Sequence, residues 1–98
     1  MNPKKVRKLR QRLEELRRGV GNMPSKKLER FAKSLERRRA KGGSEPTWVS
    51  NIFPDHRPIS IPHHSRNLSK YVATNILDQF EIDIARLEMT IERSNGHE

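Results

Sequence analysis

Two adjacent histidines, His63 and His64, stand near the end of the segment RPISIPHHS at residues 57–65. Imidazole takes up and releases protons near neutral pH, so such a pair can serve in general acid–base catalysis. The pair follows a short strand-like run and precedes a predicted helix, whose free N-terminal amides can hold an anion. Proton transfer, metal binding and a structural role in the turn are therefore the three interpretations to compare.

Metal binding is disfavoured, because adjacent side chains in extended backbone point in opposite directions and cannot easily share one ion. The next histidine, His56, is seven residues before His63, and the chain has no cysteine. We therefore expect no metal and no cofactor. In the structural alternative, His63 bonds a backbone carbonyl or packs under the last helix while His64 remains exposed, since a strand-to-helix turn needs polar groups.

The proton-transfer hypothesis has a definite chemistry. If the substrate is RNA, its cleavage without a metal needs a base for the 2′-hydroxyl, a cation for the phosphorane and an acid for the leaving oxygen. His63 or His64 would act as base or acid, with Glu45 as an orienting or proton-accepting group. Arg57, or the cluster Arg37–Arg39, would supply the cation.

The charge of the chain is divided unevenly. Residues 1–41 hold 16 Lys and Arg against 4 Asp and Glu, whereas residues 42–98 hold 5 against 8. The net charges are +12 and −3, which together give the +9 of the whole chain. A basic half of this kind indicates a surface for a polyanion, of which nucleic acid is the usual example. The candidate RNA-contact residues are Arg37, Arg38, Arg39, Lys41 and Arg57, extended by Lys26, Lys27, Arg30 and Lys33. The alternative is an ordinary solvated surface.

Length and composition limit the protein class. Ninety-eight residues suit one domain with a small core, and 32% hydrophobic against 34% charged residues are too polar for a large enzyme core. The absence of cysteine excludes disulfides, thiolate metal sites and cysteine nucleophiles. No apolar run approaches the roughly 18 residues that a membrane span needs, and the basic N-terminus lacks a signal-peptide apolar stretch. We expect a cytoplasmic protein without a membrane partner.

The basic half is predicted to form two helices. Residues 4–18 carry one narrow apolar stripe, so this helix is either a solvated amphipathic arm or needs a partner surface. Residues 25–36 carry a broader stripe, with Ser25 as the expected N-cap. Residues 37–39 either extend the second helix or begin an extended edge, and periodicity does not decide between them. The stripes are Val6, Leu9, Leu13 and Leu16 in the first helix, and Leu28, Phe31, Ala32 and Leu35 in the second.

The second half is predicted to form a hairpin and a long helix. Residues 47–53 and 57–62 have strand-like composition, and prolines bracket the second run. Residues 69–92 form a helix capped by Ser69 or Asn67. Its length of about 36 Å exceeds a small core, so its end should pack against residues 4–18 or another subunit. Its buried side is Val72, Ile76, Phe80, Ile84, Leu87 and Ile91, and its acidic outer face is Asp78, Glu81, Asp83 and Glu88. A sheet packed under helices buries these faces together, which predicts an α+β fold.

The run from Ser25 to about Asp83 resembles the HicA-type, or YcfA-like, toxins of bacterial type II toxin–antitoxin systems. SKKLERFAKSL is similar to the first helix of that family, Gly43-Ser44 falls where its G-S-H segment leads into a strand, and IPHHS is similar to its V/I-P-x-H-S segment. The family pattern L-x-x-x-T-x-x-x-I-L follows with altered spacing, at Leu68, Thr74, Ile76 and Leu77.

The resemblance implies a small α-β-β-β-α sandwich like a double-stranded-RNA-binding domain, at residues 23–98, with a basic helical extension at residues 1–22. It also implies an endoribonuclease that acts on mRNA and is neutralised by a HicB-type antitoxin. The sequence departs from the family at one point, because Glu45 stands where the G-S-H histidine is expected. The alternatives are a non-catalytic RNA-binding module and a protein-interaction subunit whose basic N-terminal helix docks on an acidic partner.

Overall fold

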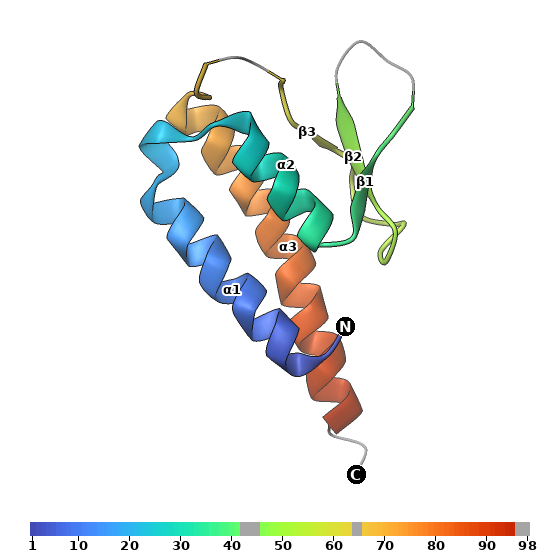
Figure 1. Cartoon of the computed structure of the whole chain (residues 1–98). Helices are drawn as coiled ribbons and strands as arrows, with labels where there is room; N and C mark the ends of the chain where they lie inside the picture. Colours follow the sequence, from blue (N-terminus) through green and yellow to red (C-terminus); the bar gives the residue numbers. More distant parts are fainter. Residues whose placement is uncertain (42–45, 64–65, 96–98) are drawn as a thin grey trace.

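The computed structural model describes residues 1–41, 46–63 and 66–95. These residues form a small α+β protein of three α-helices and a three-stranded antiparallel sheet in the order β1-β2-β3, in agreement with the predicted class (Figure 1). The elements are α1 (Pro3–Arg18), the 3-10 turn η1 (Val20–Asn22), α2 (Ser25–Ser34), β1 (Arg37–Arg39), β2 (Thr47–Ser50), β3 (Ile59–Ser60) and α3 (Lys70–Asn95).

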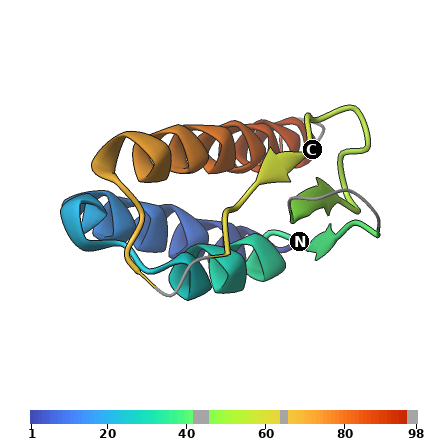
Figure 2. The same cartoon turned by 90° about the horizontal axis from the view of Figure 1, so that it is seen from above.

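The helices α1 and α2 lie on the same side of α3, and the sheet lies beside α2 and α3 (Figure 2). One face of the sheet is turned toward the helices, because Arg37 pairs with Ser50, Trp48 pairs with Ile59, and all four side chains are buried. The opposite face carries Arg38, which is exposed. No helix in the described ranges is both long enough and apolar enough to pass through a membrane.

The first helix is not a solvated arm. Its whole apolar stripe is buried, and α1 runs antiparallel beside α3 (Figure 1). The guanidinium of Arg10 lies 2.6 Å from the carboxylates of Glu81 and Glu88, and Arg17 lies 2.9 Å from Asp78. The hydrogen bonds that Arg10 donates to Glu88 and Glu81 raise its pKa above the ordinary value. The expected packing of the last helix against residues 4–18 is therefore confirmed.

These ion pairs also correct the expected acidic outer face of the last helix. Asp78, Glu81 and Glu88 contact the arginines of α1, so part of the charge asymmetry along the sequence is balanced inside the molecule. Asp83 is not on an outer face at all, because only 1% of it is exposed.

The second helix packs the predicted stripe into the core but ends earlier than expected. The last helical residue is Ser34, and Glu36 has a φ of 60°, a left-handed conformation in which a right-handed helix cannot continue. Residues 37–39 then form the edge strand β1, which resolves the alternative that periodicity left open. Pro24 rather than Ser25 occupies the N-cap position, and Ser25 is buried.

The hairpin strands are shorter than predicted, and local polar groups explain why. The Ser50 hydroxyl accepts hydrogen bonds from the amides of Ile52 at 3.2 Å and Phe53 at 2.9 Å, so the chain turns directly after β2. The strand β3 contains only Ile59 and Ser60, because Pro58 and Pro62 cannot donate to a sheet ladder.

The start of α3 is fixed by a predicted cap and by a backbone contact. The Ser69 hydroxyl accepts a hydrogen bond from the amide of Val72 at 3.2 Å. Just before it, the amide of Leu68 donates to the carbonyl of Met23 at 2.8 Å. The segment that joins β3 to α3 is thereby held close to the start of α2.

Candidate functional site

The helix α2 carries a group of exposed cations, which we name the α2 basic surface. Its members lie on the solvent side of a helix whose other side is in the core, and none has a carboxylate partner within the described residues. These residues are Lys26, Lys27, Arg30 and Lys33. The ammonium of Lys33 lies 5.9 Å from the centre of the Trp48 ring, which holds that lysine against the sheet. Lys41 is also exposed, in the segment after β1.

His63 lies at the α2 basic surface. Its Nδ1 atom is 3.3 Å from the Glu29 carboxylate, and 61% of its side chain is exposed. Lys26 and Lys33 lie three residues before and four residues after Glu29, so they are on the same side of the helix. The partner of His63 is thus a carboxylate on α2 rather than the backbone carbonyl that a structural turn would provide. His64 and Glu45 lie outside the described residues.

Arg37 does not belong to an exposed arginine cluster, contrary to the prediction that placed it with its two neighbours. Only 4% of it is exposed, and its Nε and Nη2 atoms donate to the two carboxylate oxygens of Asp83 at 2.7 and 2.8 Å. Its Nη1 atom donates to the carbonyls of Trp48 at 2.9 Å and Arg57 at 3.3 Å. The guanidinium is therefore fully engaged inside the protein and is not available to a phosphate beside His63.

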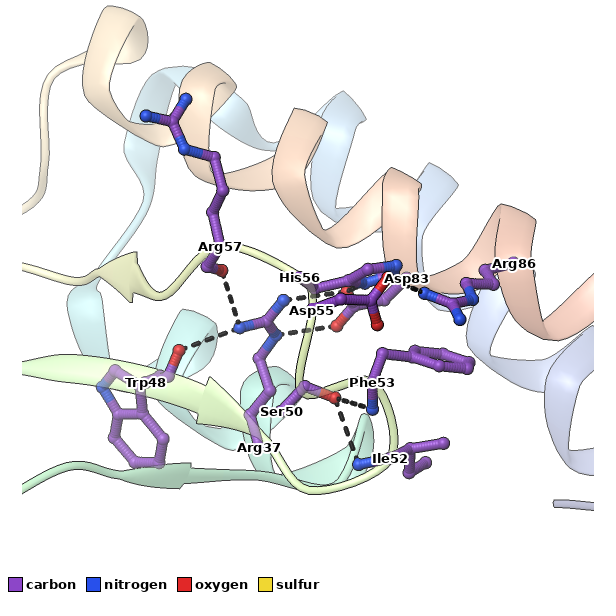
Figure 3. Close-up of polar contacts among 10 residues, drawn as sticks. All are labelled: Arg37, Trp48, Ser50, Ile52, Phe53, Asp55, His56, Arg57, Asp83 and Arg86. Carbon is purple, nitrogen blue, oxygen red and sulfur yellow. Dashed lines mark hydrogen bonds and ion pairs between the residues drawn. The ribbon is translucent and has the colours of Figure 1, made fainter.

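The other predicted arginines are exposed. Arg38 and Arg39 lie on β1, and Arg38 donates to the side-chain oxygen of Asn51 at 3.0 Å. Arg57 follows the turn between β2 and β3, and Figure 3 shows its side chain extending away from Arg37. These three residues remain candidates for phosphate contact.

A third residue completes a buried polar cluster with Arg37 and Asp83. The Nδ1 atom of His56 lies 2.7 Å from an Asp83 carboxylate oxygen, and 10% of the His56 side chain is exposed (Figure 3). The imidazole packs against the Phe53 ring, with 4.8 Å between the ring centres. Strand β1, the β2–β3 turn and helix α3 each contribute one member, so folding must be complete before the cluster exists.

This cluster forms one wall of a pocket between the β2–β3 turn and α3. The pocket has a volume of about 520 Å³. Its lining residues are Arg37, Asp55, His56, Arg57, Pro58, Gln79, Ile82 and Asp83. A pocket of this size falls within the range of small-molecule sites, which is about 300–1,000 Å³. The structure thus joins a partly accessible histidine, a buried carboxylate and two arginines at one cavity.

The sequence interpretation missed this cluster, although a signal for one member was present. Asp83 lies three residues after Phe80 and four before Leu87, which places it on the buried side of α3. A carboxylate in that position needs a cation or hydrogen-bond donors. Nothing local indicated which arginine would pair with it, and His56 lies between the two strands predicted at residues 47–53 and 57–62.

Asp55, next to His56, is tied to α3 by Arg86. The Arg86 guanidinium lies 2.6 Å from the Asp55 carboxylate and 4.5 Å from the centre of the Phe53 ring. The hydrogen bond from Arg86, followed by one from the backbone of Asp55, lowers the pKa of Asp55 below its ordinary value.

Replacing Arg86 with alanine is expected to raise the pKa of Asp55 part of the way back, because the backbone hydrogen bond remains. The interaction stabilises the native state above the ordinary pKa of aspartate, and this contribution is lost as the pH falls through the lowered pKa. An NMR titration of the Asp55 carboxyl carbon measures the change. Arg93→Ala on the same helix is the control, and an unchanged Asp55 pKa in Arg86→Ala would contradict the assignment.

Two further observations complete the site. Within residues 1–41, 46–63 and 66–95, no group of three or more His, Asp or Glu side chains is placed to hold a metal ion. The fold and site define a small α+β protein with an exposed basic helix and a buried Arg–Asp–His cluster. Comparison with protein-family models, curated proteins and solved structures finds no match to this chain.

Proposed function

We propose that this protein is a HicA-like toxin homologue that binds mRNA and is neutralised by a HicB-type antitoxin. The observation that carries the proposal is the α2 basic surface, a group of exposed cations without carboxylate partners in the described residues, with His63 on Glu29 of the same helix. These side chains would neutralise phosphate groups of RNA and release the cations condensed on the RNA, which favours binding.

The order of the elements supports the proposal. From α2 to α3 the chain forms a helix, three antiparallel strands and a helix, with both helices on one face of the sheet (Figure 2). We propose that residues 23–98 form the double-stranded-RNA-binding-domain-like sandwich that the resemblance implies. The helix α1 would then be an addition to the family fold, held by its apolar stripe and the Arg10 and Arg17 ion pairs.

The docking of α1 weakens the alternative of a protein-interaction subunit. That alternative required the basic N-terminal helix to bind an acidic partner, and α1 already contacts the acidic residues of α3. RNA binding uses the cations that remain exposed and unpaired in the described part of the chain. It therefore accounts for more of the positive charge of the protein than the protein-interaction alternative does.

Replacing Lys26, Arg30 and Lys33 together with alanine is expected to weaken RNA binding and reduce its salt dependence. Each phosphate contact on a single strand contributes about 0.7 to the slope of log affinity against log salt, so three contacts would lower the slope by about 2. Fluorescence anisotropy with a labelled single-stranded RNA at several salt concentrations measures both quantities.

The matched control replaces Arg7, Lys8 and Arg12 on the exposed side of α1 and removes the same charge. A larger loss in the α2 variant supports a localised interface. Equal losses in the two variants would mean that net charge alone attracts RNA, and no loss in the α2 variant would contradict the proposal.

A further inference from the structure

We infer that the pocket beside His56 is an RNA-cleaving centre in which His56, held by Asp83, is the general base. The inference rests on the proposed RNA-binding function. The inference assigns the role of general base to His56, which the fold orients, instead of to His63 or His64.

The hydrogen bond to Asp83 fixes which nitrogen of the neutral imidazole carries the proton. Arg37 donates to both oxygens of Asp83, and a carboxylate in this state only accepts hydrogen bonds. Nδ1 of His56 must therefore carry the proton that it shares with Asp83 at 2.7 Å. The neutral ring then has its lone pair on Nε2, which is the arrangement that a general base requires.

The Nε2 atom of His56 is available to a ligand. It makes no hydrogen bond to any residue in the described ranges. Nε2 is also accessible to solvent. Among the described residues, the side-chain atom that is both buried and without a hydrogen-bond partner is Nε1 of Trp48. A histidine that served only to neutralise Asp83 would be redundant, because Arg37 already bonds both of its oxygens.

Three other lining residues suit a ribose phosphate, and the Asp55 carboxylate, which also lines the pocket, is paired with Arg86 at 2.6 Å. Arg57 is an exposed cation without a carboxylate partner in the described residues, and it can contact the non-bridging phosphate oxygens. The Gln79 side chain can donate to the sugar or base, and Ile82, which is 57% exposed, offers apolar surface to the ribose. The 2′-hydroxyl of the bound nucleotide would donate to Nε2 of His56.

The reaction follows from these positions. Nε2 of His56 removes the proton of the 2′-hydroxyl, and the 2′-oxygen forms a bond to the adjacent phosphorus as the bond to the 5′-oxygen breaks. Water gives a proton to the 5′-oxygen, and the proton released by His56 neutralises the hydroxide. The products are a 2′,3′-cyclic phosphate and a 5′-hydroxyl. Arg57 stabilises the negative charge of the phosphorane.

The test compares wild type, His56→Gln and His63→Gln with labelled RNA in EDTA, at saturating and subsaturating RNA. Removal of a general base is expected to lower the saturated cleavage rate by about 10²-fold or more. RNA affinity should be nearly unchanged in His56→Gln. Any loss of cleavage rate in His63→Gln should result from weaker RNA binding, because His63 lies at the α2 basic surface. The cleavage rate of this variant should therefore return to the wild-type value at saturating RNA.

The outcomes separate this inference from the proposed function. Binding without cleavage by wild type, or cleavage that persists in saturated His56→Gln, overturns the inference and leaves RNA binding intact. Loss of saturated cleavage in His63→Gln alone also overturns it. Absence of RNA binding removes both proposals.

A second measurement covers the case in which His56→Gln does not fold. Wild-type protein is titrated with each of the four nucleoside 3′-monophosphates, while the imidazole ¹⁵N resonances of His56 and His63 are followed. We expect a saturable shift at Nε2 of His56 that exceeds the shift at His63. The absence of any shift at His56 would overturn the assignment of this pocket.

Discussion

Replacing Arg37 with leucine is expected to lower the free energy of unfolding by about 3–5 kcal/mol, because it leaves the buried carboxylate of Asp83 without its main partner. Both side chains of the pair are sealed from solvent, at 1% and 2% exposure, and two hydrogen bonds join them. The loss also frees the carbonyls of Trp48 and Arg57, which accept from the same guanidinium. Urea unfolding followed by circular dichroism measures the change.

Arg38→Leu is the matched control, since Arg38 is the next residue in the same strand and is exposed. It should change stability by no more than about 0.5 kcal/mol, as surface substitutions usually do. The double variant Arg37→Leu/Asp83→Leu should recover much of the loss, because no isolated charge remains buried. A loss in Arg37→Leu no larger than that in Arg38→Leu would show that the buried pair contributes little.

Replacing Phe80 with alanine is expected to cost about 3–5 kcal/mol, the usual range for removal of a fully buried aromatic ring. Phe80 is completely buried and packs edge-to-face on Phe31, with 5.1 Å between the ring centres. This contact joins α3 to α2, so the cavity would lie between the two helices that cover the sheet. Thermal and urea unfolding should show the same ranking of variants.

Tyr71→Ala on the same helix is the control, because 77% of Tyr71 is exposed. Its effect should stay within about 0.5 kcal/mol. A double-mutant cycle with Phe31→Leu should give a coupling of about 0.5–1.5 kcal/mol for the aromatic pair. A loss below about 1 kcal/mol in Phe80→Ala would mean that the α2–α3 interface is not packed as described.

The α2 basic surface and the His56 pocket, the two regions proposed to act on RNA, are held in place by different parts of the fold. The α2 basic surface stands on a helix whose inner side is held by Phe31 and Leu28, so its cations keep their places while remaining hydrated. The His56 pocket depends on partners from β1 and α3. Loss of the Arg37–Asp83 pair should therefore disturb the pocket before it disturbs the basic surface.

Much of the fold follows from local patterns in the sequence. The apolar stripes at Val6–Leu16 and Leu28–Leu35 correctly indicated two helices. Of the two caps predicted for the third helix, Ser69 and Asn67, the structure shows Ser69 in that role. The strand composition indicated the hairpin but not its extent. Its strands end early because Ser50 bonds the amides after it, a detail that composition alone does not specify.

The sequence by itself determined the helical stripes and indicated the α+β class, because periodicity and strand composition are set by residues close together in the chain. The excess of positive charge follows from composition alone. Only the tertiary structure decided that Arg37 is buried while Arg38 is exposed, and that Asp83 joins His56 rather than solvent. The partners of Asp83 lie 46 and 27 residues away along the chain. A charged residue beside a buried stripe has many possible partners until the fold brings one within bonding distance. Local periodicity does not predict which partner that will be.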